Sequence, residues 1–137
     1  MFTDNIKAMG TNEENKNVTI LIAEDEESNF LLLKTILKRH CNVLQARTGR
    51  ELLKVYAEQG ADLILLDIKM PEMNGIDALK EIRKKDTKIP VIMQSAYAFE
   101  NDMEAARAAG SNGFITKPIN IVELKKTISK FLPQITW

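Results

Sequence analysis

The sequence predicts an α/β fold in which a five-stranded parallel sheet carries helices on both faces. Short apolar runs and segments of helical period alternate five times between Val18 and Leu132. The run Leu63–Leu66 is apolar throughout, which is typical of a parallel strand buried on both faces. The 137 residues, 45% of them hydrophobic, suit one domain with a substantial core. Strands that alternate with helices imply right-handed crossovers and a parallel sheet.

The first elements follow a polar segment. Residues 1–17 have no sustained apolar period, so we expect a flexible leader or linker there. The first strand is predicted over Val18–Ala23, and Asn29–His40 then places apolar residues at helical spacing. The short apolar segment Val43–Leu44 follows as the second strand.

The second and third helices flank the third strand. The run Thr48-Gly49-Arg50-Glu51 has the form of a capping box, in which the threonine and glutamate satisfy each other's free backbone N–H groups. Gly60 ends that helix, and Asp62–Asp67 forms the third strand. After a turn, the third helix is expected over Ile76–Lys84.

The last elements repeat the alternation. Pro90 precedes the fourth strand, Val91–Ser95, and the fourth helix is expected over Glu100–Ala109 with Gly110 as a left-handed cap. The fifth strand is Gly113–Thr116. The fifth helix begins after Asn120, a typical capping residue.

Composition excludes several classes of function. Nineteen basic and nineteen acidic residues cancel, so no overall field favours nucleic acid or an anionic membrane as a partner. Cys41 is the only cysteine, which excludes an internal disulfide and a cysteine-based zinc site. No apolar stretch approaches the roughly 20 residues that span a bilayer. We therefore expect a cytoplasmic protein, or the cytoplasmic part of a membrane-bound one, without direct nucleic-acid or membrane contact.

Acidic and polar side chains stand where the predicted strands end. They are Glu24, Asp25, Asp67, Ser95 and Lys117. Because the carboxyl ends of parallel strands meet at one edge of a sheet, these residues should converge. Three converging carboxylates repel one another unless a divalent cation offsets their charge, and oxygen ligands suit Mg²⁺, with Mn²⁺ as the alternative ion. An aspartate beside such a metal can attack phosphorus, while a lysine neutralises the phosphoryl oxygens.

Four motifs in this order resemble the receiver domain of two-component response regulators. They are the acidic pair Glu24-Asp25, the Asp-x-x-Met-Pro-x-x-x-Gly run of Asp67–Gly75, Ser95-Ala96 and Lys117-Pro118. The resemblance covers residues 18–132 and leaves 133–137 as a C-terminal tail. It implies a flavodoxin-like (βα)5 three-layer sandwich with strand order 2-1-3-4-5.

The resemblance also implies roles for individual residues. Asp67 would accept phosphate from a phosphohistidine on a histidine kinase or a histidine phosphotransfer protein. Glu24, Asp25, Asp67 and the backbone carbonyl of Lys69 would hold the metal. Ser95 and Lys117 would bind the phosphoryl group.

Two further pairs of residues are implied to control switching and lifetime. Ser95 and Phe114 occupy the switch positions, although Phe114 lacks the hydroxyl of the tyrosine often found there. Lys69 and Tyr97 occupy positions that tune phosphate loss. We expect the bulky Tyr97 to shield the acyl phosphate and give a long-lived phosphorylated state, which a measured half-life of seconds would contradict. Output is implied through the surface of helix four, strand five and helix five, Glu100–Phe131, which would also carry any homodimer.

Each residue also has a simpler interpretation when taken alone. The run Glu24–Glu27 is typical of a solvated helix start. Lys117 would be a surface lysine, Ser95 a strand-end hydroxyl bonded to backbone, and Phe114 a packing residue. His40, at a helix end, has no acid or hydroxyl motif around it and is not expected to be catalytic.

Three other classes of function would need different features in the sequence. A phosphohydrolase of the haloacid dehalogenase type also uses a strand-end aspartate, but it needs a second acid two residues later, where this chain has Lys69. A receiver-like interaction module that takes no phosphate would have lost the aspartate, the acidic pair or the lysine, and none is lost. A nucleotide-binding module would need a glycine-rich loop, which is missing.

The domain is either part of a longer protein or a stand-alone regulator, and features of the sequence favour each alternative. Only about five residues follow the last predicted helix, so we expect no output domain in this chain. The polar leader, together with the runs Glu24-Asp25-x-x-x-Asn29 and Ala96-Tyr97-Ala98, favours a receiver fused to a hybrid sensor histidine kinase. Met1 favours a stand-alone regulator.

Overall fold

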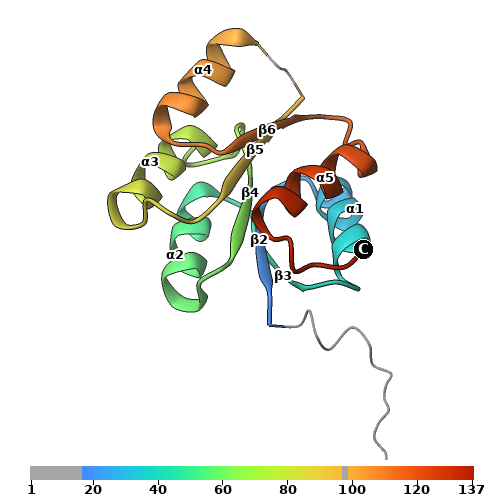
Figure 1. Cartoon of the computed structure of the whole chain (residues 1–137). Coiled ribbons are helices and arrows are strands. Elements are labelled where there is room, and N and C mark those ends of the chain that lie inside the picture. The colour runs from blue at the N-terminus through green and yellow to red at the C-terminus, as the bar shows by residue number, and fades with distance from the viewer. Residues whose placement is uncertain (1–16, 97–98) are drawn as a thin grey trace, which may run out of the picture.

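A parallel five-stranded sheet forms the centre of the protein (Figure 1). The computed structural model describes residues 17–96 and 99–137, so the predicted leader lies almost wholly outside the described residues. The strands are β2 (Thr19–Ala23), β3 (Asn42–Ala46), β4 (Leu63–Asp67), β5 (Val91–Ser95) and β6 (Gly113–Thr116). Their spatial order, β3-β2-β4-β5-β6, is the predicted 2-1-3-4-5 arrangement, and the flavodoxin-like fold is confirmed.

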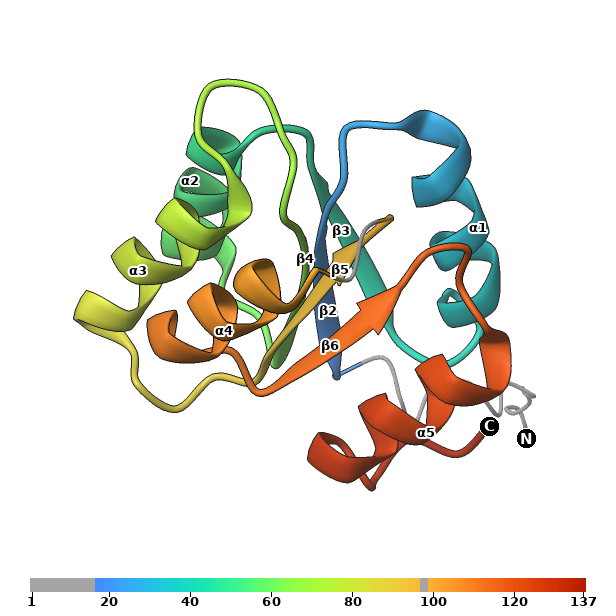
Figure 2. The ribbon, with the colours of Figure 1, turned by 90° about the horizontal axis from the view of Figure 1, so that it is seen from above.

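Helices cover both faces of this sheet, so the protein has three layers with the sheet in the middle. They are α1 (Glu27–Leu37), α2 (Gly49–Gln59), α3 (Gly75–Lys85), α4 (Glu100–Ala109) and α5 (Ile121–Phe131). Figures 1 and 2 show α2, α3 and α4 on one face and α1 and α5 on the other. None of the helices in the described part of the chain is both long enough and apolar enough to cross a membrane.

The alternation of side chains along the strands divides the core in two. On β4, Leu65 belongs to the cluster beneath α1 and α5, whereas Leu66 belongs to the cluster beneath α2, α3 and α4. On β5, Ile92 and Met93 divide in the same way. Every residue of β4 and β5 is buried, as expected for central strands of a parallel sheet.

Several elements begin or end at other residues than predicted, because hydrogen bonds and charges, rather than the spacing of apolar residues, determine where they start and stop. Helix α1 begins at Glu27, since an acid is favourable in the first turn, and ends at Leu37, whose carbonyl accepts from the N–H groups of His40 and Cys41. Strand β3 is longer than the apolar pair Val43–Leu44 because it pairs with β2 along its whole length. Helix α3 begins at Gly75, one residue before the predicted start.

Three caps were predicted from the sequence. The Asn120 side chain accepts from the Glu123 N–H at 2.9 Å, as expected for a cap of α5, and one of the other two caps differs in detail. Thr48 Oγ1 accepts from the Glu51 N–H at 3.0 Å, as a capping box requires. The Glu51 carboxylate, however, accepts from the N–H of Arg47 at 2.5 Å rather than from that of Thr48, so the reciprocal bond is displaced by one residue. Gly110 caps α4 in the left-handed region, with φ of 108°.

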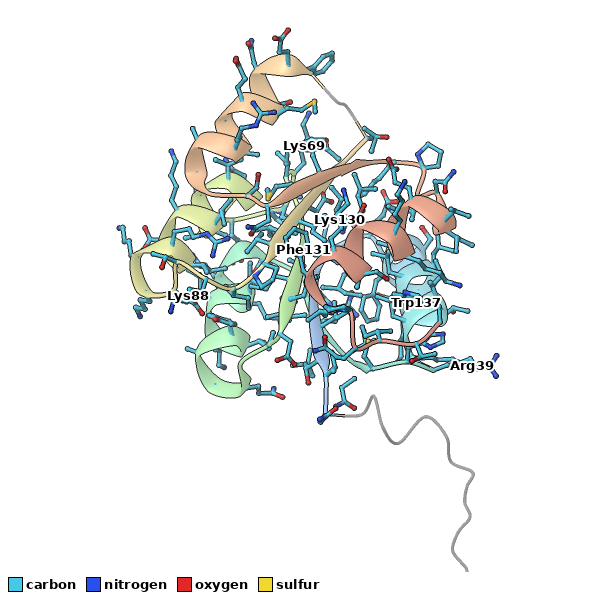
Figure 3. All side chains as sticks on the ribbon, in the orientation of Figure 1. Arg39, Lys69, Lys88, Lys130, Phe131 and Trp137 are labelled. Atoms are coloured by element: carbon cyan, nitrogen blue, oxygen red, sulfur yellow. The ribbon has the colours of Figure 1, made fainter. Side chains whose placement is uncertain are left out.

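The C-terminal residues pack against α1 and α5. Ile135 is buried in the cluster beneath these helices. The Trp137 indole N–H donates to Ser129 Oγ at 2.7 Å, and its ring meets the His40 ring edge-on with centroids 5.0 Å apart. Figure 3 shows Trp137 beside the ribbons of α1 and α5. His40 therefore has a structural role, and its Nδ1 lies 2.8 Å from the Thr136 carbonyl.

Candidate functional site

The carboxyl ends of the strands surround a cavity of about 210 Å³. Figure 2 looks down on this edge of the sheet. Residues from four strand ends and from the loops after them line the cavity: Glu24, Asp25, Glu26, Asp67, Lys69, Ser95, Ala96 and Lys117. All five residues that the strand-end argument singled out are among them. The parallel topology thus gathers side chains that are up to 93 positions apart in sequence.

Lys117 joins the two buried carboxylates of the site. Its ammonium group donates to Glu24 Oε1 at 2.8 Å and to Asp67 Oδ2 at 3.1 Å. Glu24 is 0% exposed and Asp67 is 6% exposed, so this bridge lies away from bulk water. The remaining carboxylate oxygens accept backbone bonds: the Glu26 N–H donates to Glu24 Oε2, and the Lys69 N–H donates to Asp67 Oδ1.

Burial and charge shift the acid–base properties of the bridge. Burial raises the pKa of Glu24 above its usual value, and the neighbouring charge of Asp67 adds to this effect, although the hydrogen bond from Lys117 opposes it. Burial alone would lower the pKa of Lys117, but its bonds to Glu24 and Asp67 outweigh burial and raise the pKa. The lysine is therefore held as a cation beside two acids.

The three acids form a donor set that suits a hard cation. Glu24, Asp25 and Asp67 each offer a carboxylate oxygen, and the three oxygens lie within 4.8 Å of one another. Asp25 is exposed, so the donor set opens to solvent on one side. Oxygen donors of this kind fit Mg²⁺ or Mn²⁺. The residues present therefore fit the metal that the sequence implies, and they leave an open side for a substrate.

Ser95 and Lys117 are connected through the backbone of neighbouring strands. Ser95 ends β5, is buried, and pairs in register with Thr116 of β6. Its carbonyl accepts from the Lys117 N–H at 2.8 Å. This bond holds the start of the β6–α5 connection, and with it the Lys117 side chain, against the end of β5.

Gly75 shapes the turn after Asp67. The Gly75 N–H donates to the Ile68 carbonyl at 2.7 Å, which closes the turn over residues 68–75. A Cβ atom at Gly75 would lie 2.1 Å from the Asp67 carbonyl oxygen. Only glycine allows this close approach, which explains why the motif ends with it.

The predicted switch and lifetime residues are only partly described. Phe114 is half-buried on β6, packs against the cluster beneath α2, α3 and α4, and lines a second cavity of about 210 Å³ together with Met103 and Arg107 of α4. Its switching role stays a prediction. Lys69 lies at the open edge of the sheet (Figure 3). Tyr97 lies outside the described residues.

Two polar residues, one lining the cavity and one next to Ser95 in the sequence, were not predicted as parts of the site. Glu26 lines the cavity, and its backbone N–H holds Glu24. Gln94 is buried beside Ser95, with an exposure of 2%. The signal for Gln94 was its polarity within the otherwise apolar run that begins at Val91, and the signal for Glu26 was the length of the acidic run.

The curated proteins that this chain resembles include regulators of about its own length and much longer ones. The polar-differentiation response regulator DivK of Brucella anthropi is 33% identical over 117 residues, which cover 83% of this chain and 95% of DivK. The regulatory protein AtoC of Escherichia coli (strain K12) is 39% identical over 119 residues, but these span 82% of this chain and only 25% of AtoC. The chain therefore spans about a quarter of the longer relatives that it matches.

Solved structures show the same fold. The receiver domain of the sensor histidine kinase PA1611 from Pseudomonas aeruginosa, solved with a magnesium ion coordinated in the active site cleft, superposes with a TM-score of 0.78 at 27% identity, covering 85% of this chain and 98% of that one. The receiver domain of Ssk1 from Saccharomyces cerevisiae, solved with the histidine phosphotransfer protein Ypd1, gives 0.78 at 28% identity, with 85% and 89% covered.

The match to a described family agrees with the geometry. Residues 20–129 match the family described as the response regulator receiver domain, and this range contains every residue that lines the cavity of the site. The buried acid at the end of β4, the acidic pair and the bridging lysine occupy the positions expected from the sequence motifs. This chain belongs to the response regulator receiver domain family of two-component signalling.

Proposed function

We propose that Asp67 is the phosphoacceptor of this domain and that it takes a phosphoryl group from a phosphohistidine of a partner protein. The observation that carries the proposal is the bridge in which Lys117 Nζ contacts Glu24 Oε1 and Asp67 Oδ2 at the floor of an open cavity. It holds a nucleophilic carboxylate and a cation side by side at the point where a phosphoryl group can enter.

The transfer step follows from this arrangement. An Asp67 carboxylate oxygen forms a bond to phosphorus while the P–N bond of the phosphohistidine breaks and leaves its electron pair on the imidazole nitrogen. Lys117 then stabilises negative charge on the phosphoryl oxygens, and the Ser95 hydroxyl donates a hydrogen bond to one of them. The Lys69 N–H, 3.3 Å from Asp67 Oδ1, orients the carboxylate.

We propose that Glu24, Asp25 and Asp67, with the backbone carbonyl of Lys69, hold Mg²⁺ or Mn²⁺. When bound, the ion supplies positive charge that offsets the phosphoryl oxygens and the clustered acids. The spacing of the three carboxylate oxygens, within 4.8 Å, supports this assignment. The magnesium ion in the cleft of the PA1611 receiver also supports it.

The chemistry is tested by intact-mass analysis after incubation with acetyl phosphate, with and without Mg²⁺. We expect one added phosphoryl group that requires the ion and is absent in Asp67→Asn. Asp77→Asn, which alters an exposed aspartate on α3, is the matched control and should be phosphorylated like the wild type. Steady phosphate release without an adduct would favour the phosphohydrolase or a very fast self-dephosphorylation, and neither adduct nor release would favour an interaction module.

We further propose that the phosphodonor is a histidine kinase or a histidine phosphotransfer protein that docks on α1 and α5. These helices share one face of the sheet and begin beside the site (Figure 1). Four large apolar side chains on the first two turns of these helices are solvent-exposed: Leu31 (50%), Leu32 (40%), Ile121 (45%) and Val122 (75%). Exposed apolar patches mark interaction sites. The Ssk1 receiver bound to Ypd1 supports a partner of this class.

A charge on this patch should separate docking from chemistry. We expect Val122→Lys to slow phosphotransfer from a phosphorylated histidine phosphotransfer protein while phosphorylation by acetyl phosphate is unchanged. Glu58→Lys, on the opposite face, is the control and should affect neither reaction. An equal loss in both reactions of Val122→Lys would place the defect in the site and refute docking at this patch.

We also propose an output face, two alternative attachments and a location for this domain. The surface of α4, β6 and α5 is proposed as the output face and as the interface of any homodimer, since it contains Phe114 and the edge strand β6. Fusion to a hybrid sensor histidine kinase is supported by the PA1611 receiver, and a stand-alone regulator by DivK. A cytoplasmic location is proposed for either form.

A further inference from the structure

Basic side chains gather on the face formed by α1 and α5. Residues 28–41 and 124–137, which contain most of these helices and the segments after them, include no acidic residue. Because the whole chain carries nineteen basic and nineteen acidic residues, its charges are unevenly distributed, and the first turn of α4 holds two acids. Lys125 lies over the Trp137 ring, 5.6 Å from its centroid. The basic residues of the two segments are Lys34, Lys38, Arg39, Lys125, Lys126 and Lys130.

Four of these cations form two lines along the helices, which we call the basic stripes. On α5, the exposed residues Val122, Lys126 and Lys130 recur every four positions and therefore share one side of the helix. On the other helix, Lys34 is exposed on α1 and Arg39 is exposed just after it. Figure 3 shows Arg39 extending away from the body of the protein.

The stripes begin at the exposed apolar patch and run away from the site. Each helix starts at the edge of the sheet that carries the site, so its later turns lie farther from Asp67. With a rise of about 1.5 Å per residue, Lys126 lies about 6 Å and Lys130 about 12 Å beyond Val122 along α5. A protein that covers Val122 therefore meets these two cations roughly one and two turns farther on.

The cations of the stripes are not neutralised by neighbouring acids. No ion pair joins Lys34, Lys126 or Lys130 to an acid within residues 17–96 and 99–137. The acids of the two helices stand in the first turns, and one of them, Glu27, pairs with Arg47 at 2.9 Å. The stripes therefore present positive charge to a protein that docks on the apolar patch.

We propose that the basic stripes select the phosphodonor by binding acidic side chains that lie one and two helical turns from its apolar contact with this domain. This inference rests on the proposed function and gives the chemistry of the partner that docks there. Complementary charge speeds the encounter of two proteins and disfavours partners with a basic surface. Nucleic acid and anionic membranes also attract cations, but these stripes continue an apolar patch, and an apolar centre with a charged rim is typical of a protein interface.

The test reverses two cations of α5 and follows phosphotransfer. The probe is the phosphorylated histidine kinase or histidine phosphotransfer protein of the same organism that transfers fastest to the wild type. We expect the double substitution Lys126→Glu and Lys130→Glu to lower kcat/KM about tenfold at about 50 mM NaCl and less at about 300 mM, because salt screens exposed charges. Phosphorylation by acetyl phosphate should not change. The control, Lys80→Glu with Lys84→Glu, has the same spacing on exposed positions of α3, across the sheet, and should change neither reaction.

An exchange of charge tests whether the contact is direct. Changing two acidic residues on the docking surface of the donor to lysine should slow transfer to the wild type and restore transfer to the double variant. Replacing Lys126 and Lys130 with glutamine should give an intermediate rate, since attraction is lost without repulsion being added. A structural defect in α5 would not be rescued by a change in the donor.

The outcomes separate this inference from the proposed function. If acetyl phosphate and the donor both phosphorylate the wild type, a double variant that keeps the wild-type rate, or loses the same factor at both salt concentrations, refutes the role of the stripes alone. If no donor phosphorylates the wild type, the proposed donor class and this inference both fail. Binding of duplex DNA, phosphatidylserine vesicles or a second copy of the chain that the double variant loses, with unchanged phosphotransfer, would assign the stripes to that ligand and overturn the inference.

Discussion

Gly75→Ala is the substitution for which the structure predicts the largest effect from a single methyl group. The added Cβ would lie 2.1 Å from the Asp67 carbonyl oxygen and 3.0 Å from Ile68 Cα. An ordinary contact begins near 3.4 Å, so the turn and β4 would have to separate by about 1.3 Å. Both partners are backbone, and the 2.7 Å bond from the Gly75 N–H to the Ile68 carbonyl would be strained or lost.

The free energies involved can be compared directly. Overpacking against backbone costs about 3 kcal/mol, at the upper end of its usual range. Replacing glycine with alanine restricts the unfolded chain and returns at most about 1 kcal/mol. The net loss of about 2 kcal/mol in the free energy of unfolding corresponds to a fall of about 1 M in the urea midpoint, for an m-value of about 2 kcal/mol per M. The variant should still fold.

The assay pairs urea unfolding with phosphorylation by acetyl phosphate. Because the clash is with Asp67 itself, we expect the folded variant to be phosphorylated more slowly than the wild type. Gly113→Ala is the control, since its Cβ would meet nothing closer than 3.6 Å. An equal change of midpoint in the two variants, or full phosphorylation of Gly75→Ala, would refute the steric reasoning.

Three other predictions follow from the electrostatics and the C-terminal contacts. The folded protein keeps the Glu24 proton to a higher pH than the unfolded chain, so the contribution of Glu24 to the free energy of unfolding is full below about pH 4.5 and is lost as the pH rises through the raised pKa. Glu24→Gln should therefore raise the urea midpoint of the metal-free protein at pH 7, and this gain should vanish near pH 4. A lower midpoint at pH 7 would contradict this prediction. Burial, together with the hydrogen bond to Asp86, raises the pKa of Tyr56 to about 12, so the fold should lose stability between pH 10 and 12. The difference in tyrosinate absorbance between the wild type and Tyr56→Phe should titrate near pH 12 rather than pH 10. Ser129→Ala leaves the Trp137 indole N–H without its acceptor and should cost about 1 kcal/mol, seen as a lower urea midpoint by tryptophan fluorescence; an unchanged midpoint would show that the contact is not stabilising.

Most of the secondary structure could be predicted because its signals are local. Strands β5 and β6 and helix α4 have the predicted bounds, since proline, glycine and apolar runs delimit them. Strand β3 was predicted too short because only two of its residues, Val43 and Leu44, are large and apolar, and its remaining length comes from pairing with β2. The sequence could not show this pairing, because the partner strand lies about 20 residues away.

The candidate site was predicted as a set of residues but not as an arrangement. The rule that parallel strands end at one edge was sufficient to bring Glu24, Asp67 and Lys117 together. It could not show that Lys117 bridges both acids, or that burial raises the pKa of Glu24. Those properties depend on distances between side chains and on exclusion of water.

The sequence by itself determined the alternation of elements, the parallel sheet and the identity of the strand-end acids, since hydrophobic period and strand-end position are properties of short segments. Tertiary structure decided which of those residues are buried, which oxygens Lys117 contacts and where the amide of Gln94 lies. It also decided that residues 133–137 pack onto the core through Ile135 and Trp137. The physical reason is that these features arise from contacts between segments distant in the chain, whose energies depend on packing and desolvation that no short segment specifies.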